Sequence, residues 1–339
     1  MEARIRSVAT DATSPPEAQA AYATALQQLC KAGGDELRLQ VLRVLSRNAY
    51  SVQELCHILD ARQSGLSHHL KILAAAGLVT KRREGNSLFY RRCWRSEHSA
   101  LAALHEALLN SADQLALSAD QQQRLEEVVA ERAERSRAFF AEHAGEFHEQ
   151  QEQMVAYAVY GQSSAELLRA SQPEGGELAI EIGPGEGAFL TELSGHYREV
   201  IALDNSDAML AQAQQFAEAK GLNNARFILG NSSSDALPTA AADCVVCNMV
   251  LHHVPSPSDI FHDAERLLKP GGLFSVTELC PHDQNWARDA CGDLWLGIEP
   301  DDLSEWASAC GLQEGPAAYL AQLNGFRVQV RQFIKPNHL

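Results

Sequence analysis

A glycine-rich run between Glu181 and Gly187 has the clearest chemical meaning in the sequence. It reads Glu-Ile-Gly-Pro-Gly-Glu-Gly and lies between an apolar segment, Leu178–Ile182, and a helical segment that we expect to begin near Phe189. Glycines in such a turn let a ligand lie against bare backbone, and the amides at the start of the next helix favour a negatively charged group. An ordinary tight turn can have the same composition, so the run needs a second feature to predict a ligand.

Asp204 is that second feature. It follows the next apolar segment, Val200–Leu203, and lies 21 residues beyond Gly183. A carboxylate at the end of the second strand of a nucleotide-binding sheet accepts hydrogen bonds from ribose hydroxyls. Together the two features predict a site for a nucleoside-containing ligand, either a dinucleotide or S-adenosylmethionine (SAM).

A second group of residues has the chemistry of a polyanion-binding surface. Between residues 62 and 95 there are eight Lys and Arg residues and one acid, Glu84. The chain as a whole has a formal charge of −16, but residues 1–110 hold 14 basic against 10 acidic residues, and residues 111–339 hold 14 against 34. Because attraction to phosphates is screened within about 10 Å at 0.1 M salt, a local basic stretch in an acidic protein still favours nucleic acid.

The patterns around this basic stretch predict a winged helix-turn-helix. Its expected elements are a helix beginning at Asp35, a short helix at Val52–Leu59, a helix at Gln63–Ala76 and a β-hairpin formed by Leu78–Arg83 and Ser87–Arg92. Ser51 and Glu54 have the spacing of a capping box at the start of the short helix. On the third helix Leu66, Leu70 and Leu73 form one apolar stripe, which leaves polar side chains on the opposite face.

That polar face and the hairpin carry the residues expected to contact DNA. They are Arg62, Gln63, Ser64, Ser67, His68, Lys71, Lys81, Arg82, Arg83 and Arg91. A helix in this position reads base edges in the major groove, while basic side chains on a wing contact phosphates. The hairpin is either a solvated surface or such a wing, and the helix beside it favours the wing.

The stretch SVQELCHILDARQSGLSHHLKILAAAGLVTKRREGNSLFYR resembles the winged-helix domain of the ArsR (arsenical-resistance regulator) family, over about residues 18–105. The resemblance implies double-stranded operator DNA as a partner and a homodimer as the binding form. Metal-sensing members of that family have clustered Cys and His ligands. Here the second helix keeps only the isolated pair Cys56-His57, so we predict no metal site.

The second half of the chain predicts an α/β domain. From Glu177 onward short apolar runs alternate with helical segments, which is typical of a parallel sheet wound with helices. The expected strands are Leu178–Ile182, Val200–Leu203, Arg226–Leu229, Cys244–Asn248, Leu273–Glu278, and a terminal pair near Tyr319–Leu323 and Phe326–Ile334. Residues 111–153, rich in Gln, Glu, Arg and Ala, predict one long connecting helix.

Five segments of this half resemble the class I SAM-dependent methyltransferases, over about residues 154–334. In chain order they read EIGPGEGAFL, VIALDNSDAML, FILGNSSSDALP, ADCVVCNMVLHHV and LLKPGGLFSVTEL. The resemblance implies a Rossmann-like fold that binds SAM or its product S-adenosylhomocysteine (SAH). The implied contacts are Glu181, Gly183, Pro184, Gly185, Gly187, Asp204, Asn205, Met209, Gly230, Asn231, Asn248 and Leu251.

The resemblance also assigns parts of the cofactor to these residues. The glycine run lines the methionine and the ribose, Asn205 and Met209 the adenine edge, and Asn248 and Leu251 the neighbourhood of the sulfonium. Asn231 departs from the family pattern, which often has Asp there, although its amide carbonyl still accepts a hydrogen bond.

Other candidate residues carry weaker signals. Cys244 and Cys247 are three apart on an expected strand and therefore point to opposite faces, which argues against a metal site. His252 and His253 are either an acid or base near the transferred methyl or, as we prefer, structural residues. An aromatic set forms either a lid over the cofactor or ordinary packing: Phe139, Phe140, Phe147, Tyr157 and Tyr160. No catalytic residue is assigned.

The predicted organisation is an arm at 1–17, a winged helix-turn-helix domain at 18–110, a helical linker at 111–153 and a SAM-binding domain at 154–339. No apolar run approaches the roughly 18 residues of a membrane span, and the N-terminus lacks a signal-peptide core. Eight cysteines without framework spacing fit free thiols. We therefore expect a cytoplasmic protein that has no membrane partner.

Two functional hypotheses follow. The first is a transcriptional repressor whose operator affinity responds to SAM or SAH and which controls genes of the methyl cycle. The alternative is an active SAM-dependent methyltransferase of a small molecule with an accessory DNA-binding domain. We favour the regulator, because the chain has neither an Asn-Pro-Pro-aromatic motif nor a cysteine set suited to methylation of arsenicals.

Overall fold

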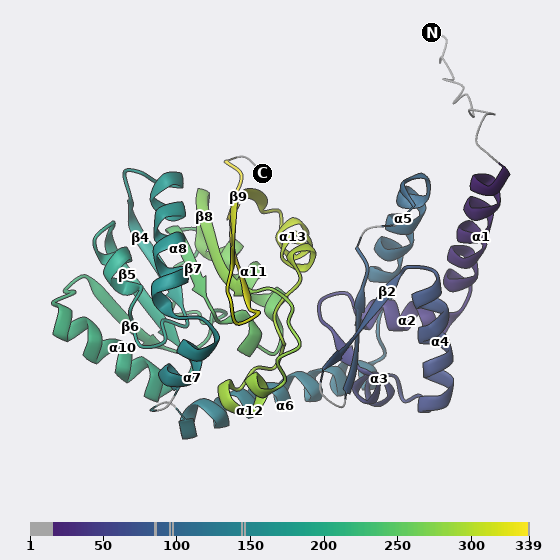
Figure 1. Cartoon of the computed structure of the whole chain (residues 1–339), viewed down its shortest axis with the longest axis horizontal. Coiled ribbons are helices and arrows are strands. Elements are labelled where there is room, and N and C mark those ends of the chain that lie inside the picture. The colour runs from purple at the N-terminus through teal and green to yellow at the C-terminus, as the bar shows by residue number, and fades with distance from the viewer. Residues whose placement is uncertain are drawn as a thin grey trace, which may run out of the picture. The chain divides into compact units, whose positions relative to one another are not determined.

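A computed structural model describes residues 16–84, 87–94, 96, 98–143, 145 and 147–337. The chain divides into two compact units, which we call unit 1 (residues 1–83 and 87–122) and unit 2 (residues 84–86 and 123–339). Each is described by itself (Figure 1). Most of the arm predicted at residues 1–17 lies outside the described residues, and its last two residues, Pro16 and Glu17, belong to the first helix.

Unit 1 is helical with a small antiparallel sheet. Its helices are α1 (Pro16–Gly33), α2 (Glu36–Val44), α3 (Val52–Leu59), α4 (Gln63–Ala75), the 3₁₀ helix η1 (Ser99–Leu101) and α5 (Ala102–Asp113). The strands β1 (Tyr50–Ser51), β2 (Val79–Glu84) and β3 (Ser87–Arg92) form a sheet in the order β1-β3-β2. The predicted helix-turn-helix and hairpin are confirmed.

Local contacts explain why these helices form where the sequence predicts them. The Ser51 hydroxyl accepts a hydrogen bond from the Glu54 amide at 3.2 Å, and the Glu54 carboxylate accepts one from the Ser51 amide at 2.7 Å. This capping box begins α3. The apolar stripe of α4 is fully buried: Leu66, Leu70 and Leu73. Its burial turns the polar face of α4 outward.

Arg92 ties α5 to the rest of unit 1. Its guanidinium is buried, donates to the Leu42 carbonyl and forms two hydrogen bonds with the Asp113 carboxylate, at 2.6 and 3.0 Å. Burial lowers the pKa of Arg92, and the neighbouring carboxylate opposes that shift. Residues 111–113 therefore complete a helix of unit 1.

The prediction of a single connecting helix over residues 111–153 is wrong. After α5 ends, α6 (Ala119–His143) and α7 (Phe147–Met154) follow as separate helices. The break has a local cause: the Ser118 hydroxyl accepts a hydrogen bond from the Gln121 amide, and the Gln121 side chain accepts one from the Ser118 amide. This reciprocal pair caps a new helix.

Unit 2 contains a seven-stranded sheet in the order β6-β5-β4-β7-β8-β10-β9. The strands are β4 (Gly176–Ile182), β5 (Tyr197–Asp204), β6 (Ala225–Leu229), β7 (Ala242–Asn248), β8 (Leu268–Leu279), β9 (Gln313–Ala321) and β10 (Arg327–Ile334). The first five are parallel, but β10 is antiparallel to both β8 and β9. The expected parallel sheet is thus a mixed one, because a short hairpin joins β9 to β10 and hairpins make antiparallel pairs.

Helices flank this sheet, with α10 against β5 and β6 and α11 against β7 and β8 (Figure 1). Besides α6 and α7, the helices of unit 2 are α8 (Tyr157–Ser171), α9 (Leu190–Ser194), α10 (Asp207–Lys220), the 3₁₀ helix η2 (Leu251–His253), α11 (Pro257–Leu267), α12 (Trp286–Cys291) and α13 (Pro300–Ala309). All seven residues of β7 are buried, as expected for a central parallel strand covered on both faces. Among the described residues, none of the helices has the length and apolar character of a membrane span.

Candidate functional site

Most of the residues predicted to bind a cofactor lie at the carboxyl ends of four neighbouring strands. The run Gly183–Gly187 follows β4, Asp204 ends β5, Gly230 and Asn231 follow β6, and Asn248 ends β7. These strands are adjacent in the sheet, in the order β6-β5-β4-β7. Since parallel strands end at the same edge, the fold brings the residues to the edge where α/β sheets bind ligands.

The three glycines after β4 all have positive φ, but they have different surroundings. A Cβ on Gly183 (φ 68°) would lie 2.5 Å from a Val250 methyl, and one on Gly187 (φ 89°) would lie 3.1 Å from the Ala213 backbone. A Cβ on Gly185 (φ 58°) would have no atom within 4 Å. Gly183 and Gly187 therefore allow close packing, whereas Gly185 borders open space in which a ligand can approach the backbone.

Glu181 is a buried carboxylate near the end of β4. Its side chain is 1% exposed, and its Oε2 has no hydrogen-bond partner among the described residues. Burial raises the pKa of Glu181 to about 8. The charge of Glu181 also adds to the effect of burial in raising the pKa of Tyr157. A cationic group beside Glu181 would compensate its burial.

Asp204 lies one strand away and is partly exposed. Its Oδ1 accepts a hydrogen bond from the Ser206 amide at 2.8 Å. Burial raises the pKa of Asp204 to about 6, although hydrogen bonds from the amides of Ser206 and Asn205 oppose the shift. The Gly230 amide donates to the Asp204 carbonyl at 2.8 Å, which holds the ends of β5 and β6 together.

The remaining predicted contacts differ in exposure. Asn205 and Asn231 are exposed, and the Asn231 Oδ1 already accepts a hydrogen bond from the Ser233 hydroxyl at 2.8 Å. Asn248 is buried. Its Oδ1 accepts a hydrogen bond from the Ser164 hydroxyl at 3.4 Å, and its Nδ2 has no hydrogen-bond partner among the described residues. Leu251 has no exposed surface, so its contact with a ligand stays a prediction that requires a local rearrangement.

Aromatic side chains at the end of α6 lie beside this edge of the sheet. Phe139 and Phe140 pack against Met209, the residue on α10 predicted to line the adenine. The Phe140 ring lies edge-on to His253, 5.0 Å between centroids, and Phe139 packs against Gly292. These contacts place two members of the predicted lid next to a predicted cofactor residue.

The other aromatic candidates are placed differently. Tyr157 and Tyr160 on α8 contact each other edge-on, 5.5 Å between centroids. The side chain of Phe147 lies outside the described residues. The structure thus shows packing contacts for the described members of the set, while closure over a cofactor stays a prediction.

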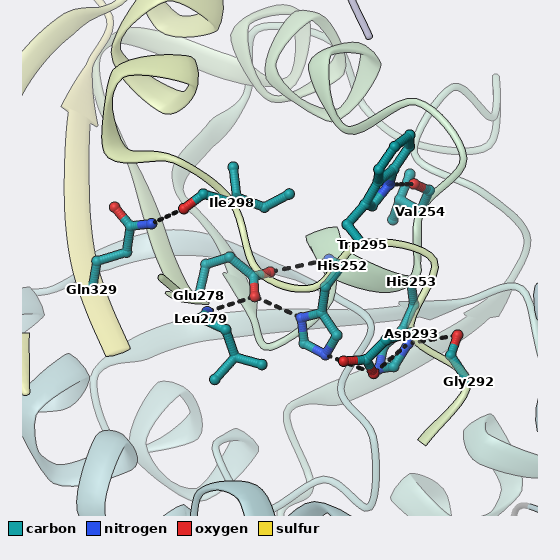
Figure 2. Close-up of polar contacts among 10 residues, drawn as sticks. All are labelled: His252, His253, Val254, Glu278, Leu279, Gly292, Asp293, Trp295, Ile298 and Gln329. Atoms are coloured by element: carbon teal, nitrogen blue, oxygen red, sulfur yellow. Dashed lines mark hydrogen bonds and ion pairs between the residues drawn. The ribbon is translucent and has the colours of Figure 1, made fainter. Parts of the chain in front are cut away.

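His252 and His253 belong to a buried polar cluster that the sequence analysis missed in part. His252 Nδ1 donates to Glu278 Oε1 at 2.6 Å, and Asp293 faces both imidazole rings (Figure 2). Burial alone would lower the pKa of His252, but the charges of Glu278 and Asp293 and the hydrogen bond to Glu278 raise it to about 9. The structural role preferred for His252 thus fits its contacts better than that of a free base.

Of the two members that were missed, Glu278 and Asp293, only Glu278 has a sequence signal. It is a charged residue among the buried residues 272–279 of β8, which marks it as a residue with a partner. Asp293 lies 41 residues beyond His252 in an irregular segment. No spacing rule connects them.

The residues predicted to contact DNA lie on α4 and on the two strands of the hairpin. The exposed ones are Arg62, Gln63, Ser64, His68, Lys71, Lys81 and Arg83. Ser67, Arg82 and Arg91 are half-buried, and Gly85 and Asn86 in the hairpin turn lie outside the described residues. Arg92, counted in the basic stretch, is instead buried against Asp113 and is not available to phosphates.

His69, next to this face, is engaged within unit 1. Its Nδ1 lies 3.3 Å from Asp35 Oδ1 and 3.2 Å from an Arg38 nitrogen, both on or beside α2. His69 therefore supports the helix-turn-helix, whereas His68, a predicted DNA contact, is exposed. The outward face of α4 therefore carries polar side chains that no buried contact requires.

Comparisons with known proteins match one family to the helix-turn-helix region and another to the sheet of unit 2. Residues 35–81 match the family described as "Bacterial regulatory protein, arsR family", and residues 180–276 match the family described as "Methyltransferase domain". An uncharacterized methyltransferase, YcgJ of Bacillus subtilis, is 25% identical over 156 residues, and a ubiquinone biosynthesis O-methyltransferase of Methylococcus capsulatus is 27% identical over 161. Each match covers 43% of this chain, and 60% and 68% of the respective relatives.

A solved structure shows the same fold. The putative methyltransferase in a complex with the Trm112 activator of Haloferax volcanii aligns with 60% of this chain and 99% of its own, with a TM-score of 0.50 and 16% identity. At that identity the likeness concerns the fold alone. Because the named relatives are methyltransferases, the comparisons support the methyltransferase alternative more than the regulator hypothesis.

Proposed function

We propose that unit 2 binds SAM and transfers its methyl group to a small molecule, while unit 1 binds duplex DNA. The proposal follows from the combination of an ArsR-family helix-turn-helix with a class I methyltransferase domain. One arrangement at the ends of two adjacent strands supports SAM most directly. It consists of a buried carboxylate (Glu181) whose Oε2 has no hydrogen-bond partner among the described residues, an open glycine (Gly185) and a partly exposed carboxylate (Asp204). SAM has a cationic amino acid part and a ribose, which these groups complement.

Each residue has a distinct proposed task. Glu181 would stabilise the positive charge of the methionine part, and the bare backbone at Gly185 would allow its close approach. Asp204 would accept hydrogen bonds from the ribose hydroxyls, and Met209 would pack against the adenine. Bound SAM supplies an electrophilic methyl group, and holding an acceptor next to it at the end of β7 suffices for rate enhancement by proximity. This mechanism needs no assigned base.

A second candidate is the regulator hypothesis, in which SAM or SAH alters DNA binding without turnover. The burial around η2 favours it. Leu251 and His252 are 0% exposed, and His252 is held by Glu278, so the histidine nearest the end of β7 is not presented to an acceptor. A buried histidine that is already paired with Glu278 fits a domain that binds the cofactor without turnover.

Unit 1 has the same proposed role in both candidates. We propose that a homodimer binds an inverted repeat whose half-sites lie about one helical turn apart, with α4 of each copy in a major groove. The exposed polar face of α4 and the basic side chains of the hairpin support this assignment.

Transfer of labelled methyl groups distinguishes the candidates. The full chain is incubated with methyl-labelled SAM and a protein-free extract of small molecules, and label is sought in products other than SAM. The methyltransferase proposal predicts labelled product that depends on the intact chain and is lost in Asp204→Ala. Binding of SAM without any labelled product would contradict it and favour the regulator.

A further inference from the structure

A group of potential metal ligands in unit 2 begins directly after Leu251, a predicted cofactor contact, but contains none of the predicted cofactor residues. His252, His253 and Asp293 each offer a ligand atom, and these atoms lie within 4.8 Å of one another. Their side chains are 0%, 7% and 0% exposed. Figure 2 shows the Asp293 carboxylate facing both imidazole rings. No metal site was predicted from the sequence, where Cys56-His57 and the pair Cys244 and Cys247 were considered as ligands.

Asp293 lies within ion-pair distance of His252 and His253, but its carboxylate has no hydrogen bond within the described part of the chain. Neither of its carboxylate oxygens has a hydrogen-bond partner among the described residues. The neighbouring ring nitrogens, His252 Nε2 at 3.9 Å and His253 Nδ1 at 3.8 Å from Oδ1, are too distant for hydrogen bonds. A buried carboxylate without hydrogen bonds is strongly unfavourable unless it pairs with a cation or coordinates a metal.

His252 is oriented as metal-binding histidines are. Its Nδ1 donates to Glu278 Oε1 at 2.6 Å, which fixes the ring so that Nε2 faces Asp293. Nε2 has no hydrogen-bond partner within the described part of the chain. A carboxylate that holds one imidazole nitrogen while the other faces a ligand set is the usual outer contact of a metal-binding histidine.

We propose that His252, His253 and Asp293 bind one divalent transition-metal ion of the zinc class, with Glu278 positioning His252. Two imidazole nitrogens and one carboxylate oxygen suit zinc, whereas magnesium and calcium prefer oxygen ligands. Ligand atoms about 2.0–2.1 Å from a tetrahedral zinc are about 3.3 Å apart, whereas those of the cluster lie within 4.8 Å of one another, so the side chains would have to move closer together around the ion. A proton on His252 Nε2 would leave to solvent when the metal binds.

The ion would join two segments that are distant in sequence. His252 and His253 form η2, which follows β7 and Asn248, and Asp293 follows α12. A shared metal would hold these segments together next to the end of β7. This role does not depend on whether the chain transfers methyl groups.

Cobalt binding tests the site. The full chain is treated with a chelator, freed of it, and titrated with Co²⁺, whose visible absorption reports four-coordinate binding. We expect one equivalent per chain, displaced by Zn²⁺. Asp293→Asn should weaken binding by more than about tenfold, and Glu278→Gln by about 10- to 100-fold. The matched control is Asp289→Asn, an exposed residue of α12, which should bind as the wild type does.

Two outcomes would overturn the proposal. One is a wild-type chain that binds no Co²⁺ and whose thermal unfolding is unchanged by Zn²⁺, in which case the cluster is an ion-paired histidine. The other is an Asp293→Asn variant that binds Co²⁺ like the wild type, which would place the metal elsewhere. Asp293→Asn removes a buried charge with little change in size, and its own unfolding midpoint without metal shows that it folds.

Discussion

Glu181 makes the stability of unit 2 depend on pH in a direction that follows from its burial. Burial raises its pKa from 4.5 to about 8, so the folded chain holds a proton that the unfolded chain loses between these pH values. Stability attributable to Glu181 therefore falls as pH rises through this window. We therefore expect the difference in unfolding temperature, Glu181→Gln minus wild type, to be larger at pH 8.5 than at pH 5.

The same residue predicts how the cofactor changes this behaviour. A cation bound beside Glu181 favours the ionised carboxylate, so saturating SAM should reduce the difference between wild type and Glu181→Gln at pH 8. Thermal unfolding with and without SAM measures this. A difference that stays constant with pH and with SAM would show that Glu181 neither titrates in this range nor contacts the cofactor.

Gly185 allows a matched test of the open space after β4. Gly185 (φ 58°) and Gly221 (φ 69°), the C-cap of α10, both have left-handed backbone, and a Cβ at either would meet nothing within 4 Å. Alanine should strain both positions by a similar amount, about 1–2 kcal/mol. Only Gly185→Ala places a methyl group in the proposed site.

Calorimetry with SAM separates the two variants. We expect Gly185→Ala to weaken binding by about 1–3 kcal/mol, the usual penalty for an overpacked contact. Gly221→Ala should bind like the wild type. Equal affinities in the two variants would place the cofactor elsewhere.

At the scale of elements, α4 and the hairpin should contribute to DNA binding in different ways. Gln63→Ala and His68→Ala, on the exposed face of α4, should change sequence preference, because base contacts specify. Arg83→Ala, on β2, should weaken binding to all sequences and reduce its salt dependence, because phosphate contacts carry no sequence information. Competition between specific and random duplexes measures both, and a uniform loss in the α4 variants would contradict its role as the reading helix.

The elements that the sequence predicts well are those set by neighbouring residues. The capping box of Ser51 and Glu54 placed α3, and leucines at helical spacing placed α4. Apolar runs likewise placed β4, β5 and β7 near their observed bounds.

What the sequence analysis missed depends on contacts between distant segments. The buried pair Arg92 and Asp113 assigns α5 to unit 1, and Asp293 reaches the histidines from 41 residues away. The direction of β10 depends on its hairpin with β9. Periodicity within a short window contains none of this information.

For the whole molecule, the second candidate function requires that cofactor and DNA affect each other's binding. Helix α6 begins within unit 1 and carries Phe139 and Phe140, which contact Met209 in unit 2. If SAM or SAH moves these aromatic residues, operator affinity should shift by roughly 5- to 150-fold, corresponding to a coupling of about 1–3 kcal/mol. The operator should then change cofactor affinity by the same factor.

Titration of an operator, selected from random duplexes, measures this coupling with no cofactor, with SAM and with SAH. Identical operator affinity in the three conditions would exclude the regulator candidate. It would leave methyl transfer as the function of unit 2.

We propose above that unit 2 binds SAM at the ends of β4 and β5. Calorimetric titration of the full chain with SAM tests it most directly, using Asp204→Ala and, as the matched control, Asp207→Ala, an exposed acid three residues away on α10. We expect one SAM per chain, a loss of roughly 1.5–3 kcal/mol of binding free energy in Asp204→Ala and no change in Asp207→Ala. No binding to the wild type, or equal binding to both variants, would contradict it.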